Sequence, residues 1–441
     1  MSEEETKKEN DEEEEKTLKE EKNDNEKENK QEEKKLEEDK NDNEKENKHE
    51  EEPNKTEKKD NNNDEKGDDK EELLINEKQE KDLLEKLDTP KEKKRYFGID
   101  LIRVFACYLV MQTHAGELYY IGPTGALLKD EKNKWPGVLN SLARICVPLF
   151  VMISGYLLLP MKTDYTTFLK KRFTRISFPF LFFCIAYDIY YYIRGFYDLK
   201  TMFINIPKIL INFGTELGHL WYMYMIMGIY LFIPIISPWV KTAQKEHFYY
   251  YFAIWFVSLF DVYIHYIYPE VWGEAYWNNT SLFQSFIGNF GYAILGCFIK
   301  LHLKENNLYI LGIILYIIGS GITMGGFFFR RPKAETCKEI ELTWHFNTIN
   351  VAMATFGMFL LLRKVECKNK KIAAIFNDIA LKSYGMYLIH IFFLQFFNYL
   401  FNGTEQHPSW CIFAIAFLTF FISYAAVKAI SYIPYSEYII G

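Results

Sequence analysis

Apolar and polar positions divide the chain into two parts near residue 95. From residue 97 onward, long apolar runs follow one another, and charged residues gather between them. Runs of about 20 apolar residues are typical of membrane-spanning helices. The pattern predicts ten such spans, placed within a few residues at 97–118, 138–159, 176–193, 217–238, 248–268, 284–303, 307–327, 346–363, 381–401 and 410–432.

The length of these runs predicts helices rather than strands. Lipid offers no hydrogen-bond partners, so only helices and closed barrels satisfy the backbone inside a bilayer. Barrel strands are about ten residues long and alternate between apolar and polar positions, whereas the runs here are longer and continuously apolar. We therefore predict an all-α, polytopic transmembrane bundle of about ten helices in residues 96–441, with the lipid bilayer as its partner.

Residues 1–95 have a different composition. They carry 39 acidic and 24 basic side chains, a net charge of −15, while the rest of the chain carries 20 and 28, or +8. The unit KNDNEKENK occurs at 22–30 and again at 40–48. Such a segment buries too little apolar surface to offset its ordering entropy, so we predict a disordered acidic tail. Within it, 71–87 has the pattern of a short amphipathic helix.

Basic loops predict the orientation of the bundle. The first residues contain no apolar segment that resembles a signal peptide, so we expect the tail to stay in the cytoplasm. KEKKR (91–95) precedes the first run, and the even-numbered loops are the basic ones: 162–175, 241–247, 300–306 and 363–371. Because positive residues favour the cytoplasmic side, both termini are predicted there. We expect the membrane to be a plasma membrane or an endomembrane.

The predicted outer loops contain three N-x-[ST] patterns, at Asn278, Asn279 and Asn402, which agree with a lumenal or external face; a fourth, at Asn54, lies in the tail. The seven cysteines show no metal-ligand spacing, so no metal is predicted. Cys107, Cys184 and Cys297 fall within predicted spans and are interpreted as small packing residues. Cys337 and Cys411 both fall on the outer side, where a disulfide between them is an open alternative to free thiols. Nothing in the sequence indicates a nucleic-acid partner, and it does not determine the oligomeric state.

The first apolar run carries ionisable residues on one face. Arg103 and His114 are eleven positions apart, which on a helix is three turns plus about 20°, and about 16–17 Å along the axis. Glu117 follows His114 by three positions, and Asp100 precedes Arg103 by three. Ionisable residues inside spans are costly and usually serve function. Individually, snorkelling of Arg103 and a structural His114 are equally good interpretations; the stripe of four favours a functional site.

Five stretches resemble the membrane-bound acyltransferase 3 family. FGIDLIRVFACYLVMQTH (97–114) resembles its opening motif, in which ten residues separate an arginine from a histidine. VPLFVMISGYLL (147–158), KKRFTRISFPF (170–180), GHLWYMYMIMGIYLFIP (218–234) and SYGMYLIH (383–390) resemble later elements in the same order. The resemblance covers 97–432 and leaves out the tail. It implies a multi-span enzyme that moves acyl groups, mostly acetyl, from acyl-CoA to hydroxyls of glycans and other acceptors.

Within this resemblance, the chemistry assigns roles to particular residues. Acyl transfer to an alcohol needs a base, and a histidine suits that task, so His114 is the candidate with Glu117 to orient its ring. Arg103, nearer the cytoplasmic face, would bind acyl-CoA. Lys171, Arg172 and Arg175 are candidate phosphate ligands of the donor, although cytoplasmic loops are commonly basic without such a role.

Other polar residues are candidates for the acceptor side. Ser154 has the chemistry of an oxyanion donor, but a small residue that lets helices approach is the commoner role. His219 and Trp221 begin the fourth run and are placed to contact the acceptor, with an aromatic-belt role for Trp221 as the alternative. His390 is a second candidate histidine, for which packing is an equal alternative. Tyr156, Tyr384 and Tyr387 are interpreted as structural.

A membrane transporter is the alternative function. Intramembrane Arg, His and Glu also mark substrate or proton paths. The two halves of the chain show no internal pairing and no matching pair of broken helices, which weakens this alternative. GITMG (321–325), a small-xxx-small pattern, is interpreted as a packing site. The sequence does not name the acceptor hydroxyl, for which a glycan, a lipid-linked sugar, a metabolite and a peptide are all open.

Overall fold

The computed structural model describes residues 96–122, 125–211, 218–304, 306–401 and 406–441. Contacts divide the chain into a first unit, Met1–Glu92, and a second, Lys93–Gly441. The predicted disordered tail, its helix at 71–87 and the acceptor patterns at Asn54 and Asn402 lie outside the described residues.

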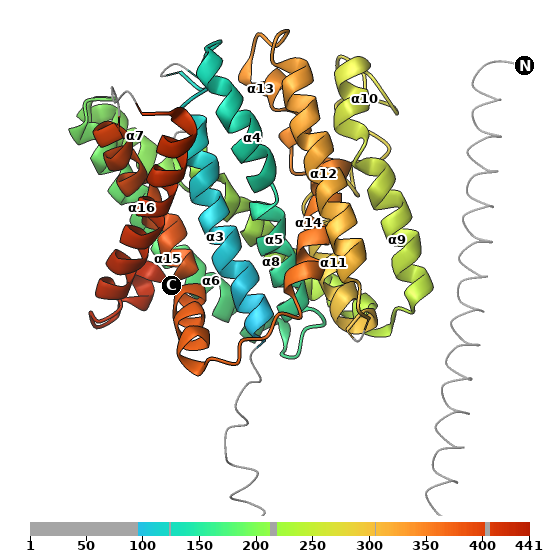
Figure 1. The fold of residues 1–441 in the computed structure, drawn as a ribbon. Helices are drawn as coiled ribbons and strands as arrows, with labels where there is room; N and C mark the ends of the chain where they lie inside the picture. Colours follow the sequence, from blue (N-terminus) through green and yellow to red (C-terminus); the bar gives the residue numbers. More distant parts are fainter. Residues whose placement is uncertain (1–95, 123–124, 212–217, 305, 402–405) are drawn as a thin grey trace, which may run out of the picture. The chain divides into compact units, whose positions relative to one another are not determined.

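Helices make up the described part of the second unit, which contains no β-strand (Figure 1). The all-α prediction is confirmed. The helices are α3 (Phe97–Glu117), α4 (Lys134–Ala143), α5 (Cys146–Leu158), α6 (Tyr165–Ile193), α7 (Leu199–Lys208), α8 (Trp221–Thr242), α9 (Lys245–Ser258), α10 (Asp261–Ile267), α11 (Phe290–His302), α12 (Tyr309–Arg330), α13 (Cys337–Ile340), α14 (Ile349–Leu362), α15 (Lys370–Phe401), α16 (Pro408–Ile430) and α17 (Glu437–Ile440), with 3₁₀ turns η1 (Glu131–Asn133), η3 (Gly218–Leu220) and η4 (Leu342–Trp344).

Eight helical segments among the described residues are long and apolar enough to cross a membrane. They correspond to eight of the ten predicted spans, and they fit an integral membrane protein. The other two predicted spans are α3 and α11. α3 has the length, at 21 residues, but contains the polar stripe. α11 is apolar but has 13 residues, because the predicted run at 284–303 begins in a loop and only becomes helical at Phe290.

Successive loops alternate between the two ends of the bundle. Figure 1 shows α4, α7, α10 and α13 toward one end, while α3 begins at the other. At that second end, the Lys300 ammonium donates to the carbonyl of Leu159 (2.9 Å), and the Arg363 guanidinium donates to the carbonyl of Leu303 (2.8 Å). The ends of α5, α11 and α14 therefore lie together. This grouping agrees with the alternation that the basic loops predict.

Glycines allow two pairs of helices to approach closely. A side chain at Gly155 of α5 would meet the carbonyl oxygen of Ala293 at 1.8 Å, and one at Gly296 of α11 would meet that of Met152 at 2.1 Å. α12 and α14 make a similar contact, with Gly312 against Gly357. Small residues let backbones meet where lipid gives no hydrophobic drive.

The packing role predicted for 321–325 is wrong. Nothing lies within 4 Å of the positions where side chains at Gly321 and Gly325 would begin, whereas a side chain at Gly319 would meet the backbone of α14. The pattern lies on the face of α12 that points away from α14, so spacing alone misplaced the contact by a fraction of a turn.

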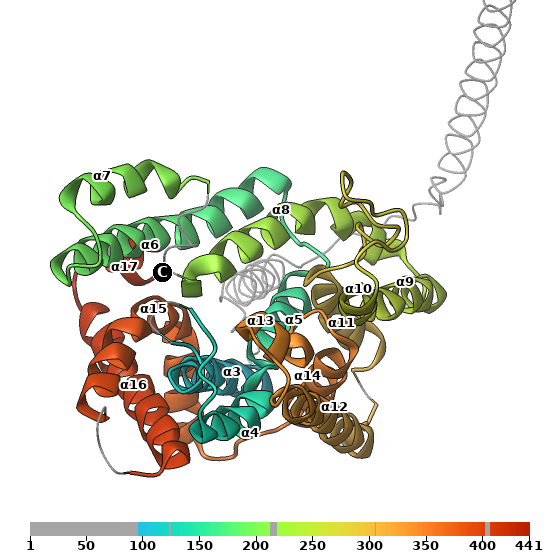
Figure 2. The same ribbon diagram turned by 90° about the horizontal axis from the view of Figure 1, so that it is seen from above.

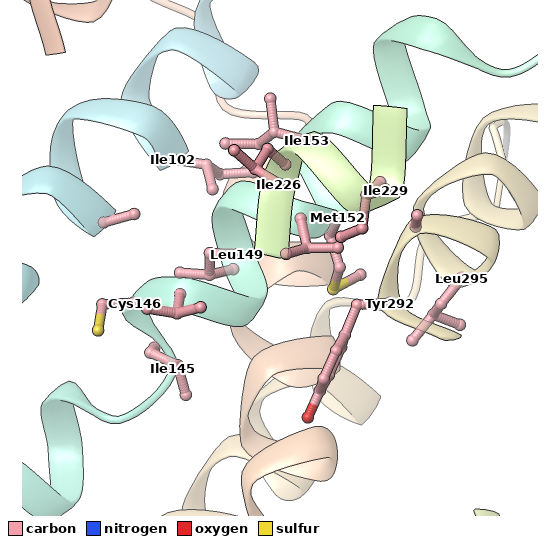
Figure 3. Packing of buried hydrophobic residues seen from close by; sticks show 14 of the residues in the cluster. Ile102, Ile145, Cys146, Leu149, Met152, Ile153, Ile226, Ile229, Tyr292 and Leu295 are labelled. Atoms are coloured by element: carbon pink, nitrogen blue, oxygen red, sulfur yellow. The ribbon is translucent and has the colours of Figure 1, made fainter. Parts of the chain in front are cut away.

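α3 lies against α4, α5, α15 and α16 (Figure 2). A large cluster of buried apolar side chains joins α3, α5, α8 and α11. Figure 3 shows Ile102 of α3, Leu149 and Met152 of α5 and Ile226 of α8 among the residues of this cluster. Close-packed interiors resist displacement of side chains, so this cluster fixes the helices that carry the polar residues described next.

Candidate functional site

One cavity brings together most of the residues that the sequence singled out. It has a volume of about 190 Å³ and lies between α3, α5, α6, α8 and α15. Seven of the nine candidate residues line it: Arg103, His114, Ser154, Arg172, Arg175, His219 and Trp221. Glu117 and Lys171 are not among the lining residues. Glu117 contacts His114, which does line the cavity, and Lys171 is exposed on α6.

His114 and Glu117 form a pair on α3. The Nδ1 of His114 lies 2.7 Å from Oε2 of Glu117, one helical turn on. A carboxylate only accepts hydrogen bonds, so Nδ1 carries the proton and donates it to Glu117. The lone pair of the neutral ring is then on Nε2. The side chains of His114 and Glu117 are 20% and 28% exposed, and of the two only His114 lines the cavity.

Two further histidines surround His114. The ring of His390 on α15 lies with its centroid 5.3 Å from that of His114, and His219 in η3 lies 5.5 Å from His390 and 6.4 Å from His114. His219 is buried and His390 is fully buried. Three imidazoles from three segments of the chain therefore form one cluster, of which His114 and His219 line the cavity.

Tyr387 holds two members of this cluster in place. Its hydroxyl donates to the backbone carbonyl of His219, and its own backbone carbonyl accepts a hydrogen bond from Nδ1 of His390 at 2.5 Å. Tyr387 also lines the cavity. These contacts agree with its interpretation as structural: the residue anchors the backbone at His219 and orients the imidazole of His390. The sequence indicated that Tyr387 and His390 are neighbours, because they are three positions apart, about one turn of α15.

Basic residues on α6 line another part of the cavity. Arg172 is partly buried, its guanidinium lies 5.7 Å from the Phe168 ring, and its Nε has no hydrogen-bond partner among the described residues. Arg175 is exposed and its Nη2 lies 3.5 Å from the carbonyl of Gly441. Both therefore present cationic groups to the cavity, as a ligand with phosphate groups requires.

Ser154 and Trp221 lie on the cavity wall with defined contacts. The Ser154 hydroxyl donates to the carbonyl of Phe150, 2.9 Å away on its own helix. This bond uses the hydroxyl proton, which an oxyanion donor would have to present instead. Trp221 is 38% exposed and stacks on Phe346 with ring centroids 5.6 Å apart. Trp221 thus packs against Phe346, and part of its ring remains exposed.

Besides the candidates that the sequence singled out, the structure contains a buried charged residue, Arg144, that sequence analysis did not identify. Arg144, which directly follows α4, forms an ion pair with Glu341 (3.8 Å), donates to the Tyr120 hydroxyl (3.3 Å) and lies over the Trp344 ring. Burial raises the pKa of Tyr120 well above its ordinary value, and the Glu341 carboxylate raises it further. The signal was available, since Arg144 is an ionisable residue inside the predicted span 138–159.

The cysteines do not form a site. All seven are free thiols, so Cys337 and Cys411 do not form the disulfide that the sequence left open. Cys107, Cys184 and Cys297 are buried, as their interpretation as packing residues requires. Among the described residues, no three His, Cys, Asp or Glu side chains are grouped to hold a metal ion.

Comparison with known proteins places the chain in a family. The sequence model of the family described as "Acyltransferase domain", acyltransferase 3, matches residues 96–428. The chain belongs to this family, and the resemblance drawn from its motifs is confirmed. Two proteins of Enterococcus faecalis, each named amino-acid racemase, are 31% and 28% identical over 135 residues. These residues are 30% of this chain but 18% and 17% of the relatives. No solved structure matches the chain.

Proposed function

We propose that this membrane acyltransferase moves an acyl group, acetyl in the first instance, from acyl-CoA to a hydroxyl of a glycan or another acceptor. One observation carries the proposal: His114, paired with Glu117, and the arginines of α3 and α6 all serve the same cavity. A base and a set of phosphate-binding cations are what transfer from a coenzyme A thioester to an alcohol needs.

His114 is the general base of the proposed reaction. Its Nε2 takes the proton of the acceptor hydroxyl as the hydroxyl oxygen bonds to the thioester carbon. The same nitrogen then returns the proton to the departing sulfur as the carbon–sulfur bond breaks. The products are an ester and free coenzyme A. Glu117 stabilises the imidazolium that exists between the two transfers, because its carboxylate accepts from Nδ1.

The donor enters past the arginines in this scheme. A cavity of about 190 Å³ is smaller than the roughly 300–1,000 Å³ of pockets that enclose a whole ligand. It suits the acyl and thioester end of the donor, so the phosphates stay toward Arg172 and Arg175. Arg103, which lines the same cavity from α3, contacts the pantetheine arm in this scheme. Lys171, exposed and off the cavity wall, adds long-range attraction alone.

The acceptor reaches His114 from the side of His219 and Trp221. The open face of Trp221 suits a sugar ring or another flat, partly apolar group. Positive loops put the arginine side in the cytoplasm, where acyl-CoA is made, and the acceptor on the outer or lumenal side. Both termini are then cytoplasmic. Ser154 shapes the wall near the acceptor.

Neither alternative activity has an observation in its favour. The racemase activity named for the two relatives belongs to proteins of which the alignment covers less than a fifth, so it is not proposed here. The transporter interpretation explained the polar stripe as an ion path, but membership of an acyltransferase family favours the enzyme.

The test is transfer of label from radiolabelled acetyl-CoA in purified membranes. We expect wild type to label an acceptor through an alkali-labile ester, and His114→Ala to lose transfer by at least about a hundredfold, since general bases contribute 10²–10⁴. His247→Ala removes an exposed histidine of α9 and serves as the matched control. A folded His114→Ala protein that labels the acceptor at the wild-type rate would refute the proposal.

A further inference from the structure

His390 has a fixed orientation and one unused polar atom. Its Nδ1 is 2.5 Å from the backbone carbonyl of Tyr387, which only accepts, so Nδ1 carries the proton. The lone pair is then on Nε2. This atom is fully buried and has no hydrogen-bond partner among the described residues. A buried acceptor without a donor is unfavourable, so the arrangement calls for a physical reason.

The ring of His390 lies beside the proposed base. The ring centroids of His390 and His114 are 5.3 Å apart, so the two imidazoles are neighbours, although Nε2 of His390 makes no hydrogen bond to His114. His390 is absent from the residues that line the cavity, whereas His114 lines it. His390 therefore meets His114 rather than the substrate, and it acts on the reaction through that residue.

We propose that His390 is a positioning residue whose buried Nε2 lone pair stabilises the positive charge that His114 carries during acyl transfer. The inference rests on the proposed function, because only a base becomes charged in this way. The Tyr387 carbonyl holds the proton of His390 on Nδ1 and so leaves the lone pair on Nε2, in a ring that neighbours His114. A fixed dipole of this kind costs no reorganisation when the charge develops.

The interaction is selective for the charged state. In the resting enzyme His114 is neutral and gains little from the neighbouring lone pair. Once His114 holds the proton of the acceptor, the lone pair and the charge attract each other in a site with little water. An interaction that is stronger in the transition state than in the ground state speeds the chemical step. In the resting protein Nε2 of His390 has no hydrogen-bond donor, and this cost is offset when the same lone pair stabilises the transition state.

His390 is one of several groups that act on the charge of His114. The other titratable or charged groups that bear on His114 are Glu117 on α3, His219 in η3 and Tyr387 on α15, together with Arg144 directly after α4, which acts through Glu117, and Arg103 on α3 and Tyr222 on α8, which line the same cavity. The variants that follow leave all of these unchanged.

Two substitutions separate the two nitrogens of His390. His390→Asn keeps a donor for the Tyr387 carbonyl, because the asparagine amide occupies the place of Nδ1, but it removes the lone pair beside His114. His390→Gln loses that donor and puts an amide oxygen near the place of Nε2. We expect His390→Asn to lower the rate of acetyl transfer at least tenfold and His390→Gln to retain most of it.

The pH profile gives a readout that a structural role would not move. His114 works as a base when neutral, so activity falls on the acid side as it becomes protonated. Without the lone pair, the protonated form is less stable and forms at a lower pH. The acid limb of the His390→Asn profile should therefore shift to lower pH while the maximal rate drops. In His390→Gln the limb should stay close to that of wild type.

The experiment uses the full chain in membranes, with radiolabelled acetyl-CoA and the endogenous acceptor, and it includes His114→Ala. A fully active His390→Asn with a defective His390→Gln would show that only the bond to Tyr387 matters and would overturn the inference. An equal loss in both variants with an unmoved acid limb would do the same, as would a change confined to the KM of the acceptor. If His114→Ala remains active, the proposed function fails instead.

Discussion

The hydroxyl of Tyr387 donates a hydrogen bond to the backbone carbonyl of His219, which lies 168 positions earlier in the chain. The bond ties α15 to η3, the turn that opens α8. Because the backbone carbonyl of Tyr387 also accepts from His390, this one residue anchors the backbone at His219 and orients the imidazole of His390, and both histidines neighbour His114. The catalytic geometry proposed here thus depends on a tyrosine that needs no contact with the reacting atoms.

Tyr387→Phe tests this dependence. Phenylalanine preserves the ring but leaves the carbonyl of His219 without its donor, which costs about 1–3 kcal/mol when a buried group loses its partner. We expect acetyl transfer to fall about tenfold, since 1.36 kcal/mol corresponds to a tenfold change in rate. Tyr399→Phe, on an exposed position of α15, is the control. Unchanged kinetics in Tyr387→Phe would show that His219 needs no such support.

Glu117→Gln removes the charge that faces His114 but keeps an oxygen to accept from Nδ1. Hydrogen bonds to charged groups contribute about 1.5–3 kcal/mol, against about 1 for neutral ones. The rate of acetyl transfer should therefore fall about tenfold, and further in Glu117→Ala, which leaves Nδ1 with no acceptor. Glu335→Gln changes an exposed carboxylate and should leave the rate unaltered. Wild-type turnover in Glu117→Gln would argue against an orienting carboxylate.

Arg172→Ala and Arg175→Ala should weaken donor binding. A lost charge-assisted contact of about 1.5–3 kcal/mol corresponds to a rise of about tenfold or more in the KM for acetyl-CoA. The effect should shrink at high salt, because Arg175 is exposed and its charge is screened. Lys170→Ala, on the same helix but off the cavity wall, is the matched control. A selective rise in the KM of the acceptor would place these arginines on the other substrate.

Gly155→Ala and Gly321→Ala form a matched pair for stability. The added carbon at position 155 would meet the Ala293 carbonyl at 1.8 Å, while nothing lies within 4 Å at position 321. Overpacking costs about 1–3 kcal/mol, so Gly155→Ala should unfold at a lower temperature in detergent and give less monodisperse protein. Gly321→Ala should match wild type. Equal melting temperatures for all three proteins would show that α5 and α11 separate without cost.

Asp164 provides a pH-dependent helix cap at the start of α6. The backbone N–H of Thr167 donates to its carboxylate (2.8 Å) and holds the pKa of Asp164 below its ordinary value. A lowered pKa means that the cap stabilises the first turn above the ordinary pKa, about 3.9, and is lost as the pH falls through the lowered value. Hydrogen exchange at 165–169 should thus speed up, beyond the intrinsic rate, only in strong acid.

Asp164→Asn accepts the same bond without titrating and should show no such acid transition. Asp164→Ala should exchange quickly at every pH, because it has no capping oxygen. An acid transition that persists in Asp164→Asn would have to come from another group.

Local helical geometry let the sequence predict the stripe on α3. Arg103, His114 and Glu117 lie on one helix, and the rise and rotation per residue fix their relative positions whatever surrounds them. The same reasoning identified nearly all of the apolar helices, because lipid leaves the backbone no other arrangement. It did not foresee that the run at 284–303 starts in a loop, since apolar loop residues and apolar helix residues have the same composition.

The sequence by itself determined the helical class of the bundle, the alternation of its loops and the order of residues along α3. Only the tertiary structure decided that His219 and His390 lie beside His114 and that the Ser154 hydroxyl donates a hydrogen bond to the carbonyl of Phe150. It also decided that the close contact between α12 and α14 lies at Gly319 rather than at Gly321. These outcomes depend on how helices distant in sequence pack. Lipid solvates an apolar helix face as well as another helix does, so hydrophobicity alone does not select which faces pack together. Side-chain fit and buried hydrogen bonds make that selection.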